Sequence, residues 1–237
     1  MTTLAAHTPR LIQDEALRDR TDVFEDRAEA GRALARLLTQ SGEAPARILA
    51  IPAGGVPVAV EVARELGWPL DVAVVSKITL PWNTEAGYGA VAFDGSVLLN
   101  DDLVRECGLT QAQVDQGVAN TRRKVEQRGK RLRRDQGALR LDGERVVLID
   151  DGLASGFTMR AAVAACRRAG AARVIVAIPT GHAHAVERLG EWVDVIVCAN
   201  VRGGPSFAVA DAYQRWSDVP EAQAELQLDR LRAGTAA

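Results

Sequence analysis

Short apolar runs alternate along the chain with longer stretches whose apolar residues recur at helical spacing. Each run is bounded by glycine or polar residues and has the length of a buried strand: 47–52, 71–75, 145–149, 173–178 and 193–198. Helical spacing recurs over four stretches: 26–38, 56–66, 158–168 and 183–189. Because strands that alternate with helices form parallel sheets covered on both faces, we expect one α/β domain over residues 1–237. Its core is expected to be a central, mostly parallel five-stranded sheet flanked by helices.

The remaining segments carry weaker signals. Residues 1–25 show no clear period and are expected to form an irregular N-terminal arm. Residues 77–95 are rich in glycine, proline and asparagine, which predicts a flexible hood loop. A short strand is expected at 96–100 and a long polar helix at 110–136, and residues 199–237 are set apart as a C-terminal segment.

Composition and charge exclude several classes of protein. The 237 residues are 47% hydrophobic and 25% charged, which is ordinary for a globular chain and excludes disorder. The net charge of −2 gives no overall basic field for nucleic acid. The sequence has no apolar run of membrane-spanning length and no secretory leader, so we expect a cytoplasmic protein with no membrane partner. The three cysteines lie far apart, so neither a zinc ribbon nor a redox dithiol is expected.

The strongest chemical signal is a pair of carboxylates at the end of a buried strand. Within 146–159 an apolar strand ends in Asp150 and Asp151, and a loop of small residues then opens a helix. Two adjacent carboxylates repel each other unless a cation or a hydrogen-bond donor faces them. A vicinal diol can supply such donors, and a metal carried by a ligand is the other candidate. The alternative is an ordinary helix cap, which needs only one carboxylate.

The loop after the two acids has the features of an anion site. A helix N-terminus offers unpaired N–H groups and the positive end of the helix dipole, both of which suit a phosphate. Gly152 and Gly156 allow close approach of the backbone, and the hydroxyls of Ser155 and Thr158 add donors. The loop matches neither a Walker A motif nor a dinucleotide-binding fingerprint.

Two further motifs follow predicted strands. Gly54 and Gly55 come after the run 47–52 and precede a helix, so they also expose backbone N–H groups, although a plain tight turn explains them equally well. Lys77 is expected to end the strand 71–75 and to lie near the other two motifs.

The stretch 146–159 resembles the phosphoribosyl pyrophosphate signature of type I phosphoribosyltransferases, and the resemblance extends over residues 26–218. It implies that Asp150 and Asp151 hold the ribose hydroxyls. It also implies a 5′-phosphate loop made of Ala154, Ser155, Gly156, Phe157 and Thr158. The pyrophosphate loop would be Ala53, Gly54 and Gly55, and the mobile hood would contain Asn83, Glu85 and Tyr88.

The resemblance further implies an activity. The chain is expected to transfer a 5-phosphoribosyl group from phosphoribosyl pyrophosphate to a nitrogen heterocycle, with Asp150, Asp151 and Lys77 as catalytic residues. Mg²⁺ is expected to arrive with the pyrophosphate and to lie near the two acids, and similar proteins are usually homodimers. In the resembled group the residue before the two glycines is commonly arginine, whereas here it is Ala53. That missing cation motivates the alternative of a regulator that binds phosphoribosyl pyrophosphate or a nucleotide without turnover.

Several other residues have two interpretations. The stretch 122–134 is strongly basic and could form a polyphosphate-attracting rim or an RNA-binding face, but a solvated helix face is favoured because no aromatic residue interleaves it. A nucleic-acid partner is therefore not expected. His182 is a candidate for the base site. The residues Trp82, Trp192 and Trp216 could stack on a base, although burial is the favoured role of each.

Overall fold

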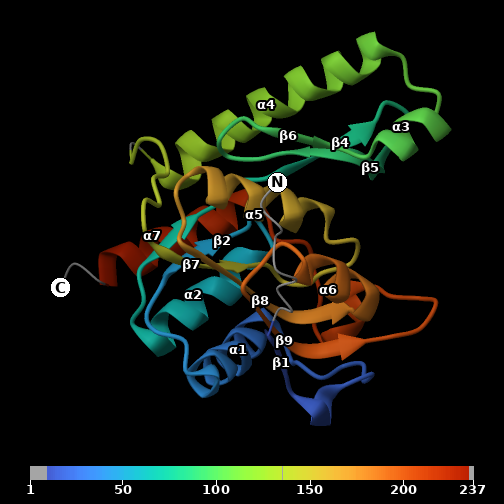
Figure 1. Cartoon of the computed structure of the whole chain (residues 1–237). Helices are drawn as coiled ribbons and strands as arrows, with labels where there is room; N and C mark the ends of the chain where they lie inside the picture. Colours follow the sequence, from blue (N-terminus) through green and yellow to red (C-terminus); the bar gives the residue numbers. More distant parts are fainter. Residues whose placement is uncertain (1–9, 135, 235–237) are drawn as a thin grey trace, which may run out of the picture.

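A six-stranded parallel sheet forms the centre of the computed structural model, which describes residues 10–134 and 136–234 (Figure 1). The strands are β1 (Arg10–Gln13), β2 (Arg47–Ala50), β3 (Leu70–Val72), β7 (Arg145–Ile149), β8 (Arg173–His182) and β9 (Val195–Arg202). Their order across the sheet is β1-β9-β8-β7-β2-β3, and every pairing is parallel. The predicted α/β class is confirmed.

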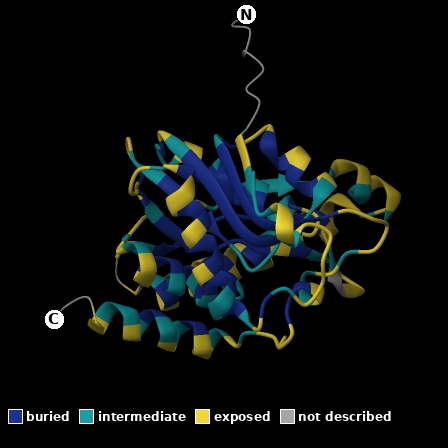
Figure 2. Cartoon of the chain, turned by 90° about the horizontal axis from the view of Figure 1, so that it is seen from below, coloured by how far each residue is buried: buried dark blue, intermediate teal, exposed yellow. Residues whose placement is uncertain are grey.

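Helices cover both faces of this sheet. One core lies under α1 (Arg27–Ser41) and α2 (Gly55–Leu66), and the other under α5 (Phe157–Arg168) and α6 (Ala183–Gly190). Successive residues of a strand point to opposite faces, so β7 sends Val147 to the first core and Leu148 to the second. Both faces therefore need apolar residues, which explains the unbroken apolar runs of the sequence. Figure 2 shows the buried strands between helices whose outer surfaces are exposed.

Local signals set the ends of these helices. The side chain of Asp26 accepts hydrogen bonds from the backbone N–H groups of Ala28 and Glu29 at the start of α1. Gly42 and Gly67 adopt the left-handed conformation directly after α1 and α2. Glycine adopts this conformation without a steric penalty, which explains why both helices end at these positions.

The predicted hood segment belongs to a second, smaller sheet. It consists of β4 (Ser76–Leu80), β5 (Asn83–Val91) and β6 (Val97–Leu99), all antiparallel, followed by α3 (Asp101–Glu106) and α4 (Gln111–Arg133). Figure 1 shows α4 lying across this sheet. Tyr88 is buried there, and a Cβ atom on Gly117 of α4 would overlap its hydroxyl. The expected short strand and long helix are both confirmed.

Two expectations about strands are wrong. The main sheet has six strands rather than five, because β1 lies within the segment 1–25 that was expected to be irregular. This strand has only four residues, pairs with β9 alone and is partly exposed, so it needs no apolar run. Lys77 does not end a strand of the main sheet: β3 ends at Val72, and Lys77 lies on β4, exposed and opposite Ala90.

The C-terminal segment contains two elements that the sequence pattern did not indicate. These are a short 3-10 turn, η2 (Val209–Ala212), and the helix α7 (Glu221–Gly234), which packs against α2 and α4. A short 3-10 turn, η1 (Glu15–Leu17), also follows β1. Within the described ranges, no helix is both long and apolar enough to cross a membrane.

Two glycines of α4 provide a matched test of its packing. A Cβ atom on Gly129 would meet no heavy atom within 4 Å, whereas one on Gly117 would overlap the Tyr88 hydroxyl. Gly129→Ala should therefore stabilise the protein by about 0.5–1 kcal/mol, because alanine loses less backbone freedom on folding. Gly117→Ala should destabilise it. Thermal unfolding of both variants checks this, and shifts of the same sign would contradict the packing of Tyr88 under α4.

Candidate functional site

The strand that precedes the glycine pair, β2, and the strand that precedes the acid pair, β7, lie side by side in the main sheet. β2 and β7 are neighbours, paired at Ala50 and Ile149, but the chain continues from β2 outward to β3 and from β7 to β8 on the opposite side. The loops that follow therefore diverge and leave a crevice at the carboxyl ends of the strands. Ligands of open α/β sheets bind at such switch points.

The glycine pair packs directly against the acid pair. A Cβ atom on Gly55 would lie 2.5 Å from the carbonyl oxygen of Ile149 and 2.8 Å from Cα of Asp150. A Cβ atom on Gly54 would lie 2.6 Å from Cγ of Asp151 and would overlap its carboxylate. Only glycine fits at these two positions without a shift of the neighbouring loop. The two glycines therefore allow the loop after β2 to approach the acid pair closely, in addition to forming a turn.

The loop from Gly152 to Thr158 surrounds a small cavity at the start of α5. The cavity has a volume of about 160 Å³ and is lined by Asp150, Gly152, Leu153, Ala154, Ser155, Gly156, Phe157, Thr158, Met159 and Val209. Gly156 precedes α5 in the left-handed conformation and has no side chain to cap the helix, and the first N–H group, that of Phe157, donates to Oγ of Ser155 at 3.4 Å. The unpaired N–H groups and the helix dipole thus face a cavity of the size of a phosphate group.

Backbone hydrogen bonds hold this loop in place. The N–H of Leu153 donates to Thr180, and the N–H of His182 donates to Leu153, with N···O distances of 2.9 Å in both cases. On the other side, a Cβ atom on Gly152 would lie 2.7 Å from Cγ2 of Val209. The segment after β9 therefore packs against the loop, and its residue Val209 forms part of one wall of the cavity.

The two acids have different surroundings. Asp150 lines the cavity, and burial together with the neighbouring Asp151 carboxylate raises the pKa of Asp150 well above its ordinary value. Asp151 points elsewhere: its Oδ2 accepts a hydrogen bond from Nε of Arg27 at 2.9 Å. The hydroxyl of Tyr213 donates to the backbone oxygen of Asp151 at 2.6 Å. Asp151 is thus turned toward Arg27, and the contact of both acids with ribose hydroxyls remains a prediction.

Arg27 and Tyr213 are site residues that the sequence analysis missed, and Trp216, a candidate for stacking on a base, lies against both. The Arg27 guanidinium lies 3.9 Å from the ring centroid of Trp216, and the Trp216 and Tyr213 rings are 5.1 Å apart. An arginine at the start of an amphipathic helix carries no signal of such a role. The favoured burial of the three tryptophans is also wrong, because Trp82, Trp192 and Trp216 are 61%, 41% and 37% exposed.

The expected hood residues lie on the small sheet. Lys77 and Asn83 are exposed on β4 and β5, whereas Tyr88 faces α4. The side chain of Glu85 lies outside the described part of the chain. The closing motion and the catalytic role of Lys77 remain predictions.

The donors at the crevice suit a magnesium ion that arrives with a ligand. Among the described residues, no group of three or more His, Cys, Asp and Glu side chains could hold a metal. The site does offer the adjacent carboxylates of Asp150 and Asp151. Because Mg²⁺ binds readily through one or two carboxylates together with substrate phosphates, this donor set fits a substrate-borne ion rather than a resident one.

Three arginines of the basic stretch 122–134 pair with α7. Arg128 and Arg131 each lie 2.8 Å from a carboxylate oxygen, on Glu221 and Glu225 respectively. Arg134 pairs with Asp229. The three acids are spaced four residues apart and so share one face of α7. These three arginines therefore take part in an internal contact, while most basic residues of the stretch are exposed, as expected of a solvated helix face.

One pair in this stretch is much more buried than the others. Arg133 makes two hydrogen bonds to Asp71, at 2.9 and 3.0 Å, and both side chains are about nine-tenths buried. Arg133→Gln should leave Asp71 buried without its cation and lower the free energy of unfolding by about 2 kcal/mol. Arg131→Gln breaks an exposed pair and should lower it by less than about 1 kcal/mol. Denaturant unfolding checks both, and equal effects would contradict this ranking.

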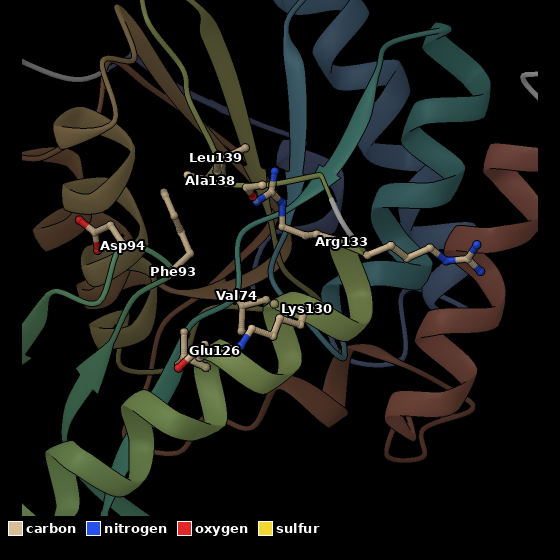
Figure 3. A pocket seen from close by; sticks show the side chains of 12 residues that line it. Val74, Phe93, Asp94, Glu126, Lys130, Arg133, Ala138 and Leu139 are labelled. Atoms are coloured by element: carbon tan, nitrogen blue, oxygen red, sulfur yellow. Dashed lines mark hydrogen bonds and ion pairs between the residues drawn. The ribbon is translucent and has the colours of Figure 1, made fainter.

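A larger hollow of about 470 Å³ lies between α4 and the loop before β7 (Figure 3). It contains several charged side chains, including Asp94, Glu126 and Lys130. These charges already have partners: Lys130 pairs with Glu126 at 2.7 Å, and Asp94 pairs with Arg168 at 2.8 Å. The cavity at Asp150 is smaller but combines a helix start with a carboxyl group, so it is the stronger candidate site.

Comparison with known proteins identifies the family of the chain. A family model described as "Phosphoribosyl transferase domain" matches residues 21–210. Two proteins of Mycobacterium tuberculosis, "Putative phosphoribosyl transferase MT0597" of strain CDC 1551 / Oshkosh and "Putative phosphoribosyl transferase Rv0571c" of strain ATCC 25618 / H37Rv, are 38% identical over 208 residues. These matches cover 88% of this chain and 47% of the relatives, so the chain spans about half their length.

A solved structure resembles almost the whole fold. The crystal structure of TT1426 from Thermus thermophilus has a TM-score of 0.71 and 36% sequence identity, and the match covers 88% of this chain and 98% of that chain. The residues 21–210 that match the family model include both loops of the crevice. The chain therefore belongs to the phosphoribosyl transferase domain family, the type I phosphoribosyltransferases that its sequence resembles.

Proposed function

We propose that the chain transfers a 5-phosphoribosyl group from phosphoribosyl pyrophosphate to a nitrogen heterocycle and releases pyrophosphate. The observation that carries this proposal is the cavity at the start of α5, which combines a helix N-terminus that follows a glycine with the Asp150 carboxyl. A sugar phosphate offers the matching groups, an anion at one end and hydroxyls at the other.

Each part of the donor has a candidate partner. The N–H groups at the start of α5 and the hydroxyls of Ser155 and Thr158 bind the 5′-phosphate. Asp150 accepts hydrogen bonds from the ribose hydroxyls. The pyrophosphate lies against Gly54 and Gly55, where α2 also begins without a side-chain cap among the described residues.

The reaction breaks the bond between C1 of the ribose and the pyrophosphate oxygen, and it forms a bond between C1 and a ring nitrogen. Positive charge develops on the ribose, where the carboxylates of Asp150 and Asp151 favour it. Negative charge develops on pyrophosphate, where the start of α2 at Gly54 and the charge of Lys77 favour it. When bound with the pyrophosphate, Mg²⁺ neutralises part of that charge.

The segment after β9 is the proposed wall of the acceptor site. Val209 lines the cavity, and the ring of Phe207 lies 5.5 Å from that of His182. His182 Nε2 is 3.1 Å from the backbone oxygen of Gly204. An apolar wall with one ring nitrogen and exposed backbone groups suits a flat heterocycle.

Pyrophosphate release from phosphoribosyl pyrophosphate and Mg²⁺, measured against a panel of nucleobases and related heterocycles, tests the proposal. Release that requires one acceptor, together with a ribosylated product of the expected mass, supports it. The second candidate is a regulator that binds the donor without turnover, which Ala53 at the arginine position and the engagement of Asp151 by Arg27 both favour. Tight donor binding with no release for any acceptor supports the regulator instead.

A further inference from the structure

Arg27 is the first residue of α1 and reaches the crevice from the far side of Asp151. Its Nε donates to Asp151 Oδ2 at 2.9 Å, and its Nη1 donates to the backbone oxygen of Ser217 at 2.8 Å. Its guanidinium stacks on Trp216, and the side chain is only 9% exposed. An arginine held through two of its three guanidinium nitrogens and through one face of its plane has little freedom to move.

The contacts of Arg27 complete a frame around Asp151. The Gly54 backbone closes one side of the carboxylate, and the Tyr213 hydroxyl holds the backbone oxygen. The N–H of Asp151 in turn donates to Oδ1 of Asp150 at 2.9 Å. A displacement of Asp151 would therefore alter the direction of the Asp150 carboxyl.

We propose that Arg27 is a positioning residue, which fixes Asp151 between the glycine loop and the C-terminal segment and thereby aims Asp150 into the anion cavity. This inference rests on the proposed function, since it assigns Asp150 to the sugar. The cation also offsets the repulsion between the two adjacent carboxylates, which would otherwise separate them.

A nearby arginine, Arg215, is a control that distinguishes the positioning of Asp151 from the simple attachment of α1 to the segment after β9. Arg215 also joins the segment after β9 to the start of α1, through ion pairs with Glu25 and with Asp26, the latter at 2.8 Å. Its side chain is 65% exposed, in contrast to the buried side chain of Arg27. Arg215→Gln therefore removes ion pairs between the same two segments and leaves the contact of Arg27 with Asp151 intact.

The test measures the dissociation constant of phosphoribosyl pyrophosphate with Mg²⁺ by calorimetry, together with kcat and KM, for Arg27→Gln, Arg27→Lys, Arg215→Gln and Asp151→Asn. Losing a hydrogen bond to a charged group should weaken donor binding about tenfold or more in Arg27→Gln. Arg27→Lys keeps the charge and should recover part of that loss, and Arg215→Gln should bind as the wild type does. Because Arg27 acts through Asp151, the double variant Arg27→Gln/Asp151→Asn should bind no worse than the weaker single variant.

The outcomes separate this inference from the proposed function. A wild-type chain that binds no phosphoribosyl pyrophosphate overturns the proposed function and this inference with it. Wild-type binding that persists in Arg27→Gln, additive losses in the double variant, or tighter binding in Arg27→Gln overturn the positioning role alone. If Arg27→Gln fails to fold, Trp216→Leu replaces it: Arg27 then loses its stacking partner, and a loss of binding that disappears in the Asp151→Asn background is expected.

Discussion

Asp150→Asn should lower phosphoribosyl transfer by about 100-fold or more, the largest effect expected of any single substitution here. Asparagine has the same size as aspartate, but its amide replaces one accepting oxygen with a donor. Ribose hydroxyls would then lose an acceptor and the developing positive charge would lose a carboxylate. The measurement is pyrophosphate release with the best acceptor, accompanied by the affinity for the donor.

The stability of this variant is an internal control. Because burial and Asp151 raise the pKa of Asp150, this carboxyl lowers the free energy of unfolding at pH values above its ordinary pKa, and that loss shrinks as the pH falls from the raised pKa toward the ordinary one. A neutral asparagine should therefore unfold at the same or a higher temperature than the wild type. Asp115→Asn, on the exposed surface of α4, should change neither activity nor stability. Full activity of Asp150→Asn would remove this carboxyl from the proposed mechanism.

Gly54→Ala should abolish most donor binding, with a loss of about 100-fold. The added methyl group would occupy the space of the Asp151 carboxylate, so either that carboxylate or the glycine loop must move. Both movements disturb the proposed sites for the ribose and the pyrophosphate. Calorimetric titration with phosphoribosyl pyrophosphate and Mg²⁺ measures the effect.

The control for Gly54→Ala is another glycine with helical backbone angles. Gly54 has φ −59° and ψ −37°, which alanine adopts without strain, so the expected effect is purely a matter of space. Gly129→Ala places the same methyl group where no heavy atom lies within 4 Å, and it should leave donor binding unchanged. Comparable donor affinity in Gly54→Ala and the wild type would show that the two loops can separate freely.

The parts of the crevice that the sequence predicted correctly all depend on neighbouring residues. An apolar run followed by Asp150 and Asp151 indicates a strand and what lies at its end, and the helix start at Phe157 follows within the same stretch. Because parallel strands end at the same edge of a sheet, the glycine loop and the acid loop could be expected to meet. The local sequence pattern was sufficient to predict both the acids at the end of the strand and the meeting of the two loops.

The missed features depend on contacts between distant segments. Arg27 lies 124 positions before Asp151, so no spacing rule connects them. The direction of each acid was unpredictable for the same reason, because Arg27 and the C-terminal Tyr213 determine it. Strand β1 escaped prediction because an edge strand needs few apolar residues. The hood was expected to be a loop because its glycines suggested turns, whereas β4 and β5 pair with a register shift near Thr79.

The pairing of α4 with α7 changes how a cationic run in this family should be interpreted. Arginines at 128, 131 and 134 face acids at 221, 225 and 229. Among homologous chains, a substitution of one of these arginines should therefore be accompanied by a substitution of the acid that it faces. A homologue that lacks the acidic helix but keeps the arginines would expose those charges to solvent and to any polyanion nearby. Correlated loss of both sets, by contrast, would leave the surface neutral and the fold intact.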